Sequence, residues 1–218
     1  MKESSMTVHY SGEFWERMLS EKDPDDTDFS RSLPDEELKT FCDLHLKSGA
    51  RVLDLGCGGG RNAHYLAARG FQVYGVDVSP SAVSFTARRL ARFGLRGTFL
   101  QGEMAALPFT PGFFGGIVCA AALDHVTLDR AHLALAEMRR AKTPPAKIYI
   151  TFDPIERMAA ARKNAQIQSD GSFYFHDGKK KGMLFRSYSD QEIMELIGKD
   201  YILSFEQTHH GDRVIVCT

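Results

Sequence analysis

VLDLGCGGGR, at residues 52–61, is the stretch that decides the fold of this 218-residue chain. It is a short apolar strand that runs into a glycine-rich turn. A second apolar strand, VYGVD at residues 73–77, follows it and ends on the carboxylate Asp77. Because the strand after a crossover helix lies beside the first strand, its last residue reaches the same edge of the sheet as the turn. The two stretches therefore predict a βαβ unit with a carboxylate beside a glycine turn.

The glycines of this turn indicate a pocket for an adenosine-bearing cofactor. Gly56, Gly58 and Gly60 lack a Cβ, so the backbone can adopt positive φ angles and a ligand can approach it closely. Asp77 is placed to accept hydrogen bonds from both ribose hydroxyls of a nucleoside that lies over the turn. The dinucleotide fingerprint G-x-G-x-x-G needs glycine at position 61, where this chain has Arg61, which makes a pyrophosphate-bearing dinucleotide less favoured.

With these residues the sequence resembles the class I S-adenosylmethionine-dependent methyltransferases. Residues 54–60 are similar to the first motif of that family, and Asp77 is similar to its ribose-binding acid. Residues 102–109 resemble its third motif, and residues 114–126 resemble its fourth strand with the segment that follows. The resemblance implies a methyltransferase that uses S-adenosyl-L-methionine and releases S-adenosyl-L-homocysteine.

The resemblance also implies which residues hold the cofactor. Asp54 would hold the ammonium group, directly or through water, and Glu103 and Met104 would bracket the adenine. Two aspartates of the family pattern are replaced here, by Glu103 and by Gly115, and residues 143–146 replace its Pro-Gly-Gly turn. The expected cofactor-binding residues are Asp54, Gly56, Cys57, Gly58, Gly60, Asp77, Val78, Glu103, Met104 and Ala120.

His125 is the candidate catalytic residue, because it follows the fourth strand on the edge where the reacting methyl group is expected. Its unperturbed pKa near 6.5 suits it to accept a proton from a hydroxyl or an amine. The alternative interpretation is a structural, hydrogen-bonded histidine at the start of a helix. Acceptor binding is expected from aromatic side chains, which suits a small, partly apolar molecule. These residues are Tyr10, Trp15, Phe152, Phe173 and Phe175.

Composition narrows the class of protein further. A chain of 218 residues with 43% hydrophobic residues predicts a single domain with a full core. The net charge of −1 gives no general attraction to nucleic acid or to an anionic membrane. The sequence shows no secretory signal or long apolar span, so we expect a cytoplasmic protein. The four cysteines lack C-x-x-C spacing, which predicts neither zinc nor disulfides, and the oligomeric state stays open.

Strands that alternate with helices predict a Rossmann-like, doubly wound α/β fold. By resemblance, its sheet has seven strands and is mostly parallel with one antiparallel C-terminal strand. We expect a helical cap at 1–49, a cofactor-binding core at 50–153, an insertion at 154–190 and a C-terminal helix with a strand pair at 191–218. Core strands are expected at 51–55, 72–77, 97–101, 115–120 and 147–152, and core helices at 61–69, 80–93 and 128–141.

The segments outside the core are also predicted. Ser11 is expected to cap a first helix, and Pro34 to open a second one that ends at Gly49. A helix at 155–167 precedes a β-hairpin of 172–175 and 183–186. A short helix follows with a capping box of Ser189 and Glu192, and strands at 201–206 and 213–217 complete the chain.

Two functions of other classes remain open. One is a non-catalytic protein that binds S-adenosylmethionine as a partner subunit. The replacement of the usual aspartates by Glu103 and Gly115 supports this alternative. The other is an oxidoreductase that binds NAD. Arg61, at the third glycine position of the dinucleotide fingerprint, makes this alternative less favoured. Within the enzyme class, a macromolecular acceptor is less favoured, because residues 120–123 lack the Asn-Pro-Pro-Tyr type of motif of base methyltransferases.

Overall fold

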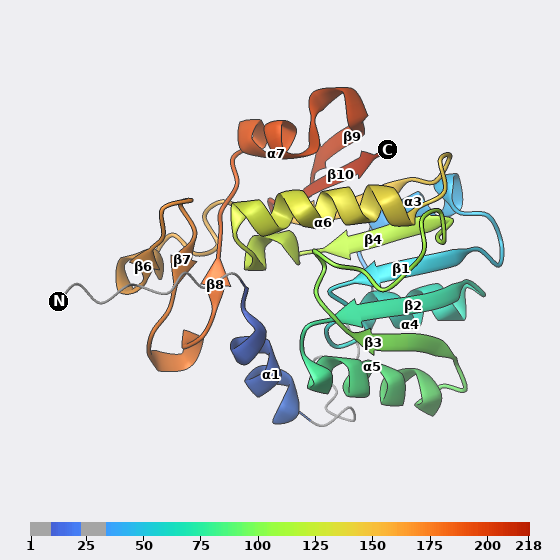
Figure 1. Ribbon diagram of the computed structural model, residues 1–218, viewed down its shortest axis with the longest axis horizontal. Coiled ribbons are helices and arrows are strands. Elements are labelled where there is room, and N and C mark those ends of the chain that lie inside the picture. Colours follow the sequence, from blue (N-terminus) through green and yellow to red (C-terminus); the bar gives the residue numbers. More distant parts are fainter. Residues whose placement is uncertain (1–9, 23–33) are drawn as a thin grey trace.

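The computed structural model describes residues 10–22 and 34–218 of the chain. Its centre is a seven-stranded sheet with the strand order β3-β2-β1-β4-β5-β10-β9 (Figure 1). Strands β1 to β5 pair in parallel, whereas β10 runs antiparallel to both β5 and β9. The predicted fold class is therefore confirmed. The strands are β1 (Arg51–Leu55), β2 (Gln72–Asp77), β3 (Gly97–Gln101), β4 (Gly116–Ala120), β5 (Ile148–Phe152), β9 (Ile202–Gln207) and β10 (Arg213–Cys217).

Each face of the sheet is covered by its own helices, because its central strands are apolar on both sides. Along β1, Leu53 and Leu55 join the apolar cluster under α6 and α7, while Val52 joins the cluster under α3, α4 and α5. With both faces buried, the carboxyl edge of the sheet is the place where a ligand can bind. The helices are α3 (Glu36–His45), α4 (Arg61–Ala68), α5 (Pro80–Arg92), α6 (Leu128–Ala141) and α7 (Asp190–Ile197).

The expected core elements agree with the structure to within one residue at each end, and the capping box of α7 is present. The predicted helix from Pro34 to Gly49 is shorter, because α3 ends at His45. Leu46 adopts an extended conformation with φ −105° and ψ 131°. Its side chain lies over Gly116, where a Cβ would come within 2.2 Å of Leu46 Cδ2. Packing against the sheet therefore ends the helix earlier than the sequence pattern suggested.

The predicted helix at 155–167 is wrong. This segment forms successive turns and a short 3₁₀ helix, Arg162–Asn164, and then a strand, β6 (Gln166–Ile167). Its sequence favours a helix locally, but β6 pairs with β7 (Phe173–Tyr174), and Met158 is buried in an apolar cluster beside that small sheet. Tertiary contacts have overridden the local preference.

A cap lies beside the carboxyl edge of the large sheet. It consists of α1 (Gly12–Ser20) and a three-stranded antiparallel sheet of β6, β7 and β8 (Leu184–Phe185) (Figure 1). The hairpin of β7 and β8 was predicted and is confirmed. Phe14 of α1 packs into the same apolar cluster as Phe173, Phe175 and Phe185. Helix and small sheet therefore form one packed unit, which we call the cap.

Ser11 precedes α1 as predicted, but its hydroxyl makes no capping bond to the helix. It bonds instead to the backbone of Leu184 in β8, 173 residues further along the chain. The expected cap interaction is therefore replaced by a contact that ties the start of α1 to the small sheet.

Two further features concern the helices and the cysteines. Within residues 10–22 and 34–218, no helix is both long and apolar enough to cross a membrane. All four cysteines, Cys42, Cys57, Cys119 and Cys217, are buried and reduced.

Candidate functional site

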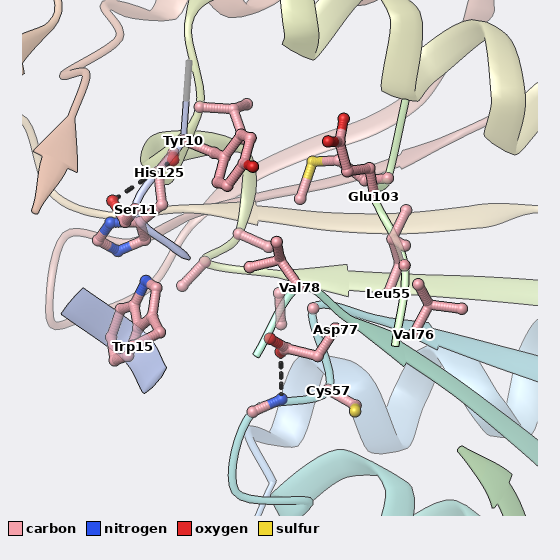
Figure 2. Close-up of a pocket in the computed structure, with 18 of the residues that line it drawn as sticks. Tyr10, Ser11, Trp15, Leu55, Cys57, Val76, Asp77, Val78, Glu103 and His125 are labelled. Atoms are coloured by element: carbon pink, nitrogen blue, oxygen red, sulfur yellow. Dashed lines mark hydrogen bonds between the residues drawn. The ribbon is translucent and has the colours of Figure 1, made fainter. Parts of the chain in front are cut away.

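A cavity of about 340 Å³ lies at the carboxyl ends of β1 to β4, between the large sheet and α1. Figure 2 shows Trp15 and His125 together at one end of it, Glu103 at the other and Asp77 between them. Its size lies in the range of small-molecule sites. The cavity contains the glycine turn and most predicted cofactor residues: Gly56, Cys57, Gly58, Asp77, Val78, Glu103, Met104 and Ala120 line it, whereas Asp54 and Gly60 do not.

The three glycines of the turn all adopt positive φ angles, 73° at Gly56, 48° at Gly58 and 72° at Gly60. A Cβ on Gly56 would lie 2.7 Å from the Cβ of Ala122, and one on Gly60 would lie 2.8 Å from Thr86. These two glycines are therefore required by close packing within the protein. At Gly58 the nearest atom to a Cβ would be 3.9 Å away, so this glycine leaves open space beside the cavity.

Asp77 is hydrogen-bonded to the glycine turn. The backbone N–H of Gly58 donates to Asp77 Oδ2 at 2.9 Å (Figure 2). The N–H of Ser79 donates to Oδ1 at 3.0 Å. Burial raises the pKa of Asp77 above its usual value, and the backbone donors oppose that shift. A carboxylate oxygen can accept more than one hydrogen bond, so Asp77 can still accept hydrogen bonds from a ligand in the cavity.

Two buried acceptor atoms beside the turn lack a hydrogen-bond partner in the described part of the chain, Asp54 Oδ2 and Asn62 Oδ1. Asn62 lines the cavity and is 8% exposed, whereas Asp54 is 1% exposed and lies behind the lining. Burial raises the pKa of Asp54 to about 7. Such unpaired acceptors fit a ligand that brings its own donors. Sequence reasoning missed Asn62, although a polar residue directly after a glycine turn and an arginine was a visible signal.

The far end of the cavity is formed by the segment after β3. Glu103 and Met104 both line it, and Arg130 of α6 pairs with Glu103 at 3.2 Å. The glutamate that replaces the usual aspartate therefore reaches a partner on a neighbouring helix, which was not visible in the sequence.

His125 lies in a short 3₁₀ helix, Leu123–His125, which follows β4. Its ring stands edge-on to Trp15 at a centroid distance of 4.9 Å and to Phe185 at 5.4 Å. Nδ1 lies 3.1 Å from the carbonyl oxygen of Leu184. Burial lowers the pKa of His125 to about 4, so the ring is neutral at physiological pH.

Helix α1 and the residues directly before it cover the cavity through two predicted aromatic side chains, Trp15 in the helix and Tyr10 ahead of it. Tyr10 and Trp15 both line it, and α1 is held over the site by Glu16. This carboxylate accepts hydrogen bonds from the hydroxyls of Ser79 at 2.7 Å and Ser81 at 2.6 Å, at the start of α5. The three remaining predicted acceptor residues do not line the cavity. Phe152 is fully buried in the core, and Phe173 and Phe175 are buried within the cap.

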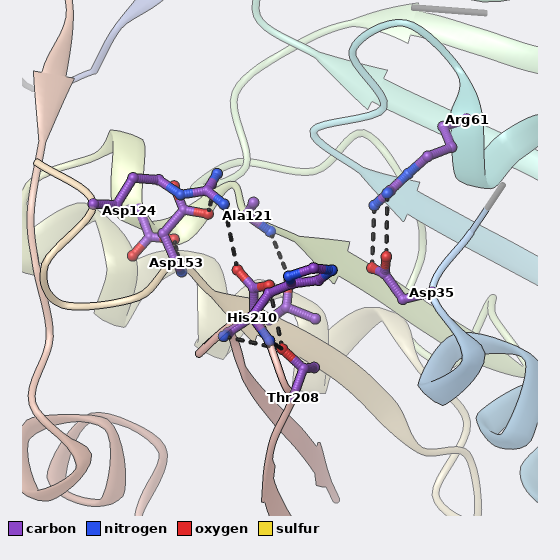
Figure 3. A network of polar contacts seen from close by, with 10 residues as sticks. Asp35, Arg61, Ala121, Asp124, Asp153, Thr208 and His210 are labelled. Atoms are coloured by element: carbon purple, nitrogen blue, oxygen red, sulfur yellow. Dashed lines mark hydrogen bonds and ion pairs between the residues drawn. The ribbon is translucent and has the colours of Figure 1, made fainter. Parts of the chain in front are cut away.

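A second polar network lies at the carboxyl ends of β4 and β5 (Figure 3). The buried Asp124 accepts a hydrogen bond from the backbone N–H of Asp153 at 3.1 Å. Arg157 pairs with Asp153 at 3.0 Å and with Asp212 at 3.7 Å. Burial raises the pKa of both Asp124 and Asp153. Among the described residues, no group of three or more His, Cys, Asp or Glu side chains has an arrangement that suits a metal ion.

Two family models match the chain. The model of a methyltransferase domain matches residues 52–145, which contain the glycine turn, Asp77 and the segment up to β5. The model of thiopurine S-methyltransferase matches residues 10–92, which also include α1. The chain carries a class I S-adenosylmethionine-dependent methyltransferase domain.

Individual relatives agree with this family. The chain is 45% identical over 60 residues to a ribosomal RNA small subunit methyltransferase C of Alcanivorax borkumensis, which covers 28% of this chain and 18% of that protein. It is 34% identical over 88 residues to a ubiquinone biosynthesis O-methyltransferase of Stutzerimonas stutzeri, covering 39% and 38% of the two chains. The chain thus spans less than half the length of either of these relatives.

A solved structure shares the fold over most of its length. It is described as a SAM-dependent methyltransferase from Methanosarcina mazei and superimposes with a TM-score of 0.70 at 21% identity. The match covers 85% of this chain and 97% of the other. At this identity the likeness concerns the fold.

Proposed function

We propose that this chain is an enzyme that transfers the methyl group of S-adenosyl-L-methionine to a small, partly apolar acceptor. The observation that carries the proposal is that one cavity joins a glycine turn and its carboxylate, Asp77, to an aromatic end that holds His125. A nucleoside and a reacting group fit these two ends by their chemistry. The aromatic end lies beyond the residues expected to bind the cofactor, and this room for an acceptor supports an enzyme over a passive binding protein.

The residues present fit this cofactor. Asp77 would accept the ribose hydroxyls, and Glu103 and Met104 would flank the adenine. The unpaired oxygen of Asn62, with Asp54 behind it, would face the ammonium of the methionyl part. Gly58 leaves space for the ligand beside the turn.

When bound, S-adenosylmethionine supplies a methyl group that is already activated by a positively charged sulfur. The chain therefore mainly has to place the acceptor in line and exclude water, for which effective molarities on the order of 10⁵ M are available. Tyr10 and Trp15 would form an apolar wall against the acceptor. His125 is neutral at physiological pH, so its unprotonated ring nitrogen could accept the proton of an acceptor hydroxyl or amine. Because burial lowers its pKa to about 4, it would be a weaker base than an ordinary histidine.

The site favours a small acceptor over a nucleic acid. Its aromatic end lies beneath α1, which the Glu16 bonds hold against α5. The relatives include both a ribosomal RNA methyltransferase and a ubiquinone biosynthesis O-methyltransferase, so they do not distinguish a nucleic-acid acceptor from a small one. The net charge of −1 adds no attraction to RNA. We further propose that the protein acts in the cytoplasm.

Calorimetric titration tests the cofactor. We expect S-adenosylmethionine and S-adenosylhomocysteine to bind and NAD not to bind. Incubation with a labelled methyl donor and a metabolite extract then tests transfer, with a reaction that lacks the protein as the blank and Asp77→Ala as a variant expected to transfer less at limiting donor. Binding without transfer would support a non-catalytic partner protein, and NAD binding alone would support an oxidoreductase.

A further inference from the structure

Ser11 lies at the border between the cap and the cavity, and its hydroxyl is fully hydrogen-bonded. It is 1% exposed. Its hydroxyl donates to the carbonyl oxygen of Leu184 at 2.7 Å and accepts from the N–H of the same residue at 2.8 Å. Both backbone groups of Leu184 are thereby held by one side chain, and a hydroxyl is one of the few groups that can do this, because it is donor and acceptor at once.

The same carbonyl oxygen is the partner of the candidate base. His125 Nδ1 lies 3.1 Å from it, and a carbonyl oxygen can only accept a hydrogen bond. Nδ1 must therefore carry a hydrogen. In a neutral imidazole the other nitrogen then has the lone pair, and the ring is neutral at physiological pH because burial lowers the pKa of His125 to about 4. His125 lines the cavity, so the ring nitrogen that carries the lone pair belongs to a side chain that a ligand can reach.

The backbone reinforces this arrangement from the other side. The N–H of Ser11 donates to the carbonyl of His125 at 3.2 Å, and Tyr10 forms an antiparallel bridge with Val126. The chain that leads into α1 therefore lies between the loop of His125 and β8, and it contacts both. Ring contacts with Trp15 and Phe185 limit the tilt of the imidazole.

We propose that Ser11 is a positioning residue: by holding the Leu184 carbonyl it fixes the proton of His125 on Nδ1, so that Nε2 is the atom that accepts the proton of the methyl acceptor. This inference rests on the proposed function for the role of that proton. When an acceptor O–H or N–H gives its proton to Nε2, the electron pair of that bond stays on the attacking atom. The imidazolium that forms keeps its Nδ1–H bond to Leu184.

The protonation state of the ring nitrogens tests the proposal without knowledge of the acceptor. Nitrogen-15 NMR of the full chain at pH 7 distinguishes a protonated from an unprotonated ring nitrogen. His125 is identified among the eight histidines by the signal that disappears in His125→Gln. We expect a protonated Nδ1 and an unprotonated Nε2 in the wild type. In Ser11→Ala we expect both signals to move towards averaged values, because the two tautomers then interconvert.

Matched variants separate positioning from general loosening of α1. Ser11→Thr keeps the hydroxyl and is expected to keep the wild-type signals. Ser81→Ala removes a hydroxyl bond that holds the same helix through Glu16 but leaves Leu184 untouched, so it is expected to keep them as well. If Ser11→Ala does not fold, Ser11→Cys, whose thiol is a weak donor of similar size, serves in its place.

Two results would overturn the inference: a wild-type proton on Nε2, or wild-type signals in Ser11→Ala. Calorimetry with S-adenosylhomocysteine on the same samples tests the proposed function separately. Failure of the wild type to bind this ligand would refute the proposed cofactor while the tautomer result stood on its own.

Discussion

Asp77 has two tasks, since it holds the glycine turn through Gly58 and would also bind the ribose. Replacing it with alanine removes a charged hydrogen-bond acceptor, a change that costs about 1.5–3 kcal/mol per bond. We therefore expect Asp77→Ala to weaken S-adenosylhomocysteine binding at least about tenfold, as measured by calorimetry. Asp200→Ala, at an exposed carboxylate far from the cavity, is the control. Equal affinity in both variants would contradict the placement of the ribose.

Asn62 gives a prediction about the other end of the cofactor. If its unpaired oxygen faces the methionyl ammonium, Asn62→Ala should lower the affinity for S-adenosylmethionine about tenfold. The affinity for 5′-methylthioadenosine should not change, because that molecule lacks the amino-acid part. The exposed Asn164→Ala is the matched control. A loss of equal size for both ligands would place Asn62 at the nucleoside instead.

At the level of secondary structure, α1 is the element on which access to the cavity depends. Glu16 joins it to Ser79 and Ser81, and hydrogen bonds to an ionised group are the stronger ones. We expect Glu16→Ala to accelerate release of S-adenosylhomocysteine about tenfold. Trp15 is the only tryptophan and lines the cavity, so its fluorescence reports the release in stopped-flow experiments. Glu13→Ala, an exposed change on the same helix, should release the ligand at the wild-type rate.

The strands of the core were predictable because glycines and carboxylates mark where the helices and strands end. Gly70 and Gly94 adopt positive φ after α4 and α5, and Asp77 ends β2, so sequence and structure coincide there. The cap was less predictable, because its contacts join residues far apart in sequence. The segment at 155–167 has a helical composition, yet pairing with β7 makes its end a strand.

The candidate site was also predictable where its signals are local, and not where it depends on long-range packing. The turn and its carboxylate are local signals, and both line the cavity, apart from Gly60 and Asp54, which lie behind it. The aromatic residues of the hairpin were expected in the site on composition alone. Only the packing against α1 shows that Phe173 and Phe175 face the interior of the cap. Asn62 was missed although its position directly after the turn was a signal, because only the structure shows that its oxygen is unpaired. Ser11 was predicted as a helix cap, and its long-range contact with Leu184 leaves no pattern in sequence.

For the molecule as a whole, the buried carboxyls Asp124 and Asp153 contribute to the way in which stability depends on pH. Burial raises the pKa of both in the folded state, so the folded protein holds protons at a pH where the unfolded chain has released them. The free energy of unfolding therefore falls as the pH rises above the ordinary carboxyl pKa near 4. Each group contributes a decrease of up to ~1.4 kcal/mol per pH unit.

Asp124→Asn removes one of these two contributions and mimics the protonated side chain. We expect its free energy of unfolding to fall less steeply than that of the wild type between pH 5 and pH 8, in denaturant titrations. Asp200→Asn, an exposed change, should follow the wild-type curve. Parallel curves for Asp124→Asn and the wild type would show that this carboxyl titrates normally in the folded state.

The burial of every native thiol has a practical consequence. Reagents that alkylate cysteine should react slowly with the native protein, since Cys42, Cys119 and Cys217 lie in the interior. Cys57 lines the cavity but is only 5% exposed, and burial raises the pKa of its thiol. A cysteine introduced at the exposed position of Glu13 would therefore accept a single dye without prior removal of the others. Combined with the lone indole nearby, such a label would let an observer follow opening and closing of the molecule in real time.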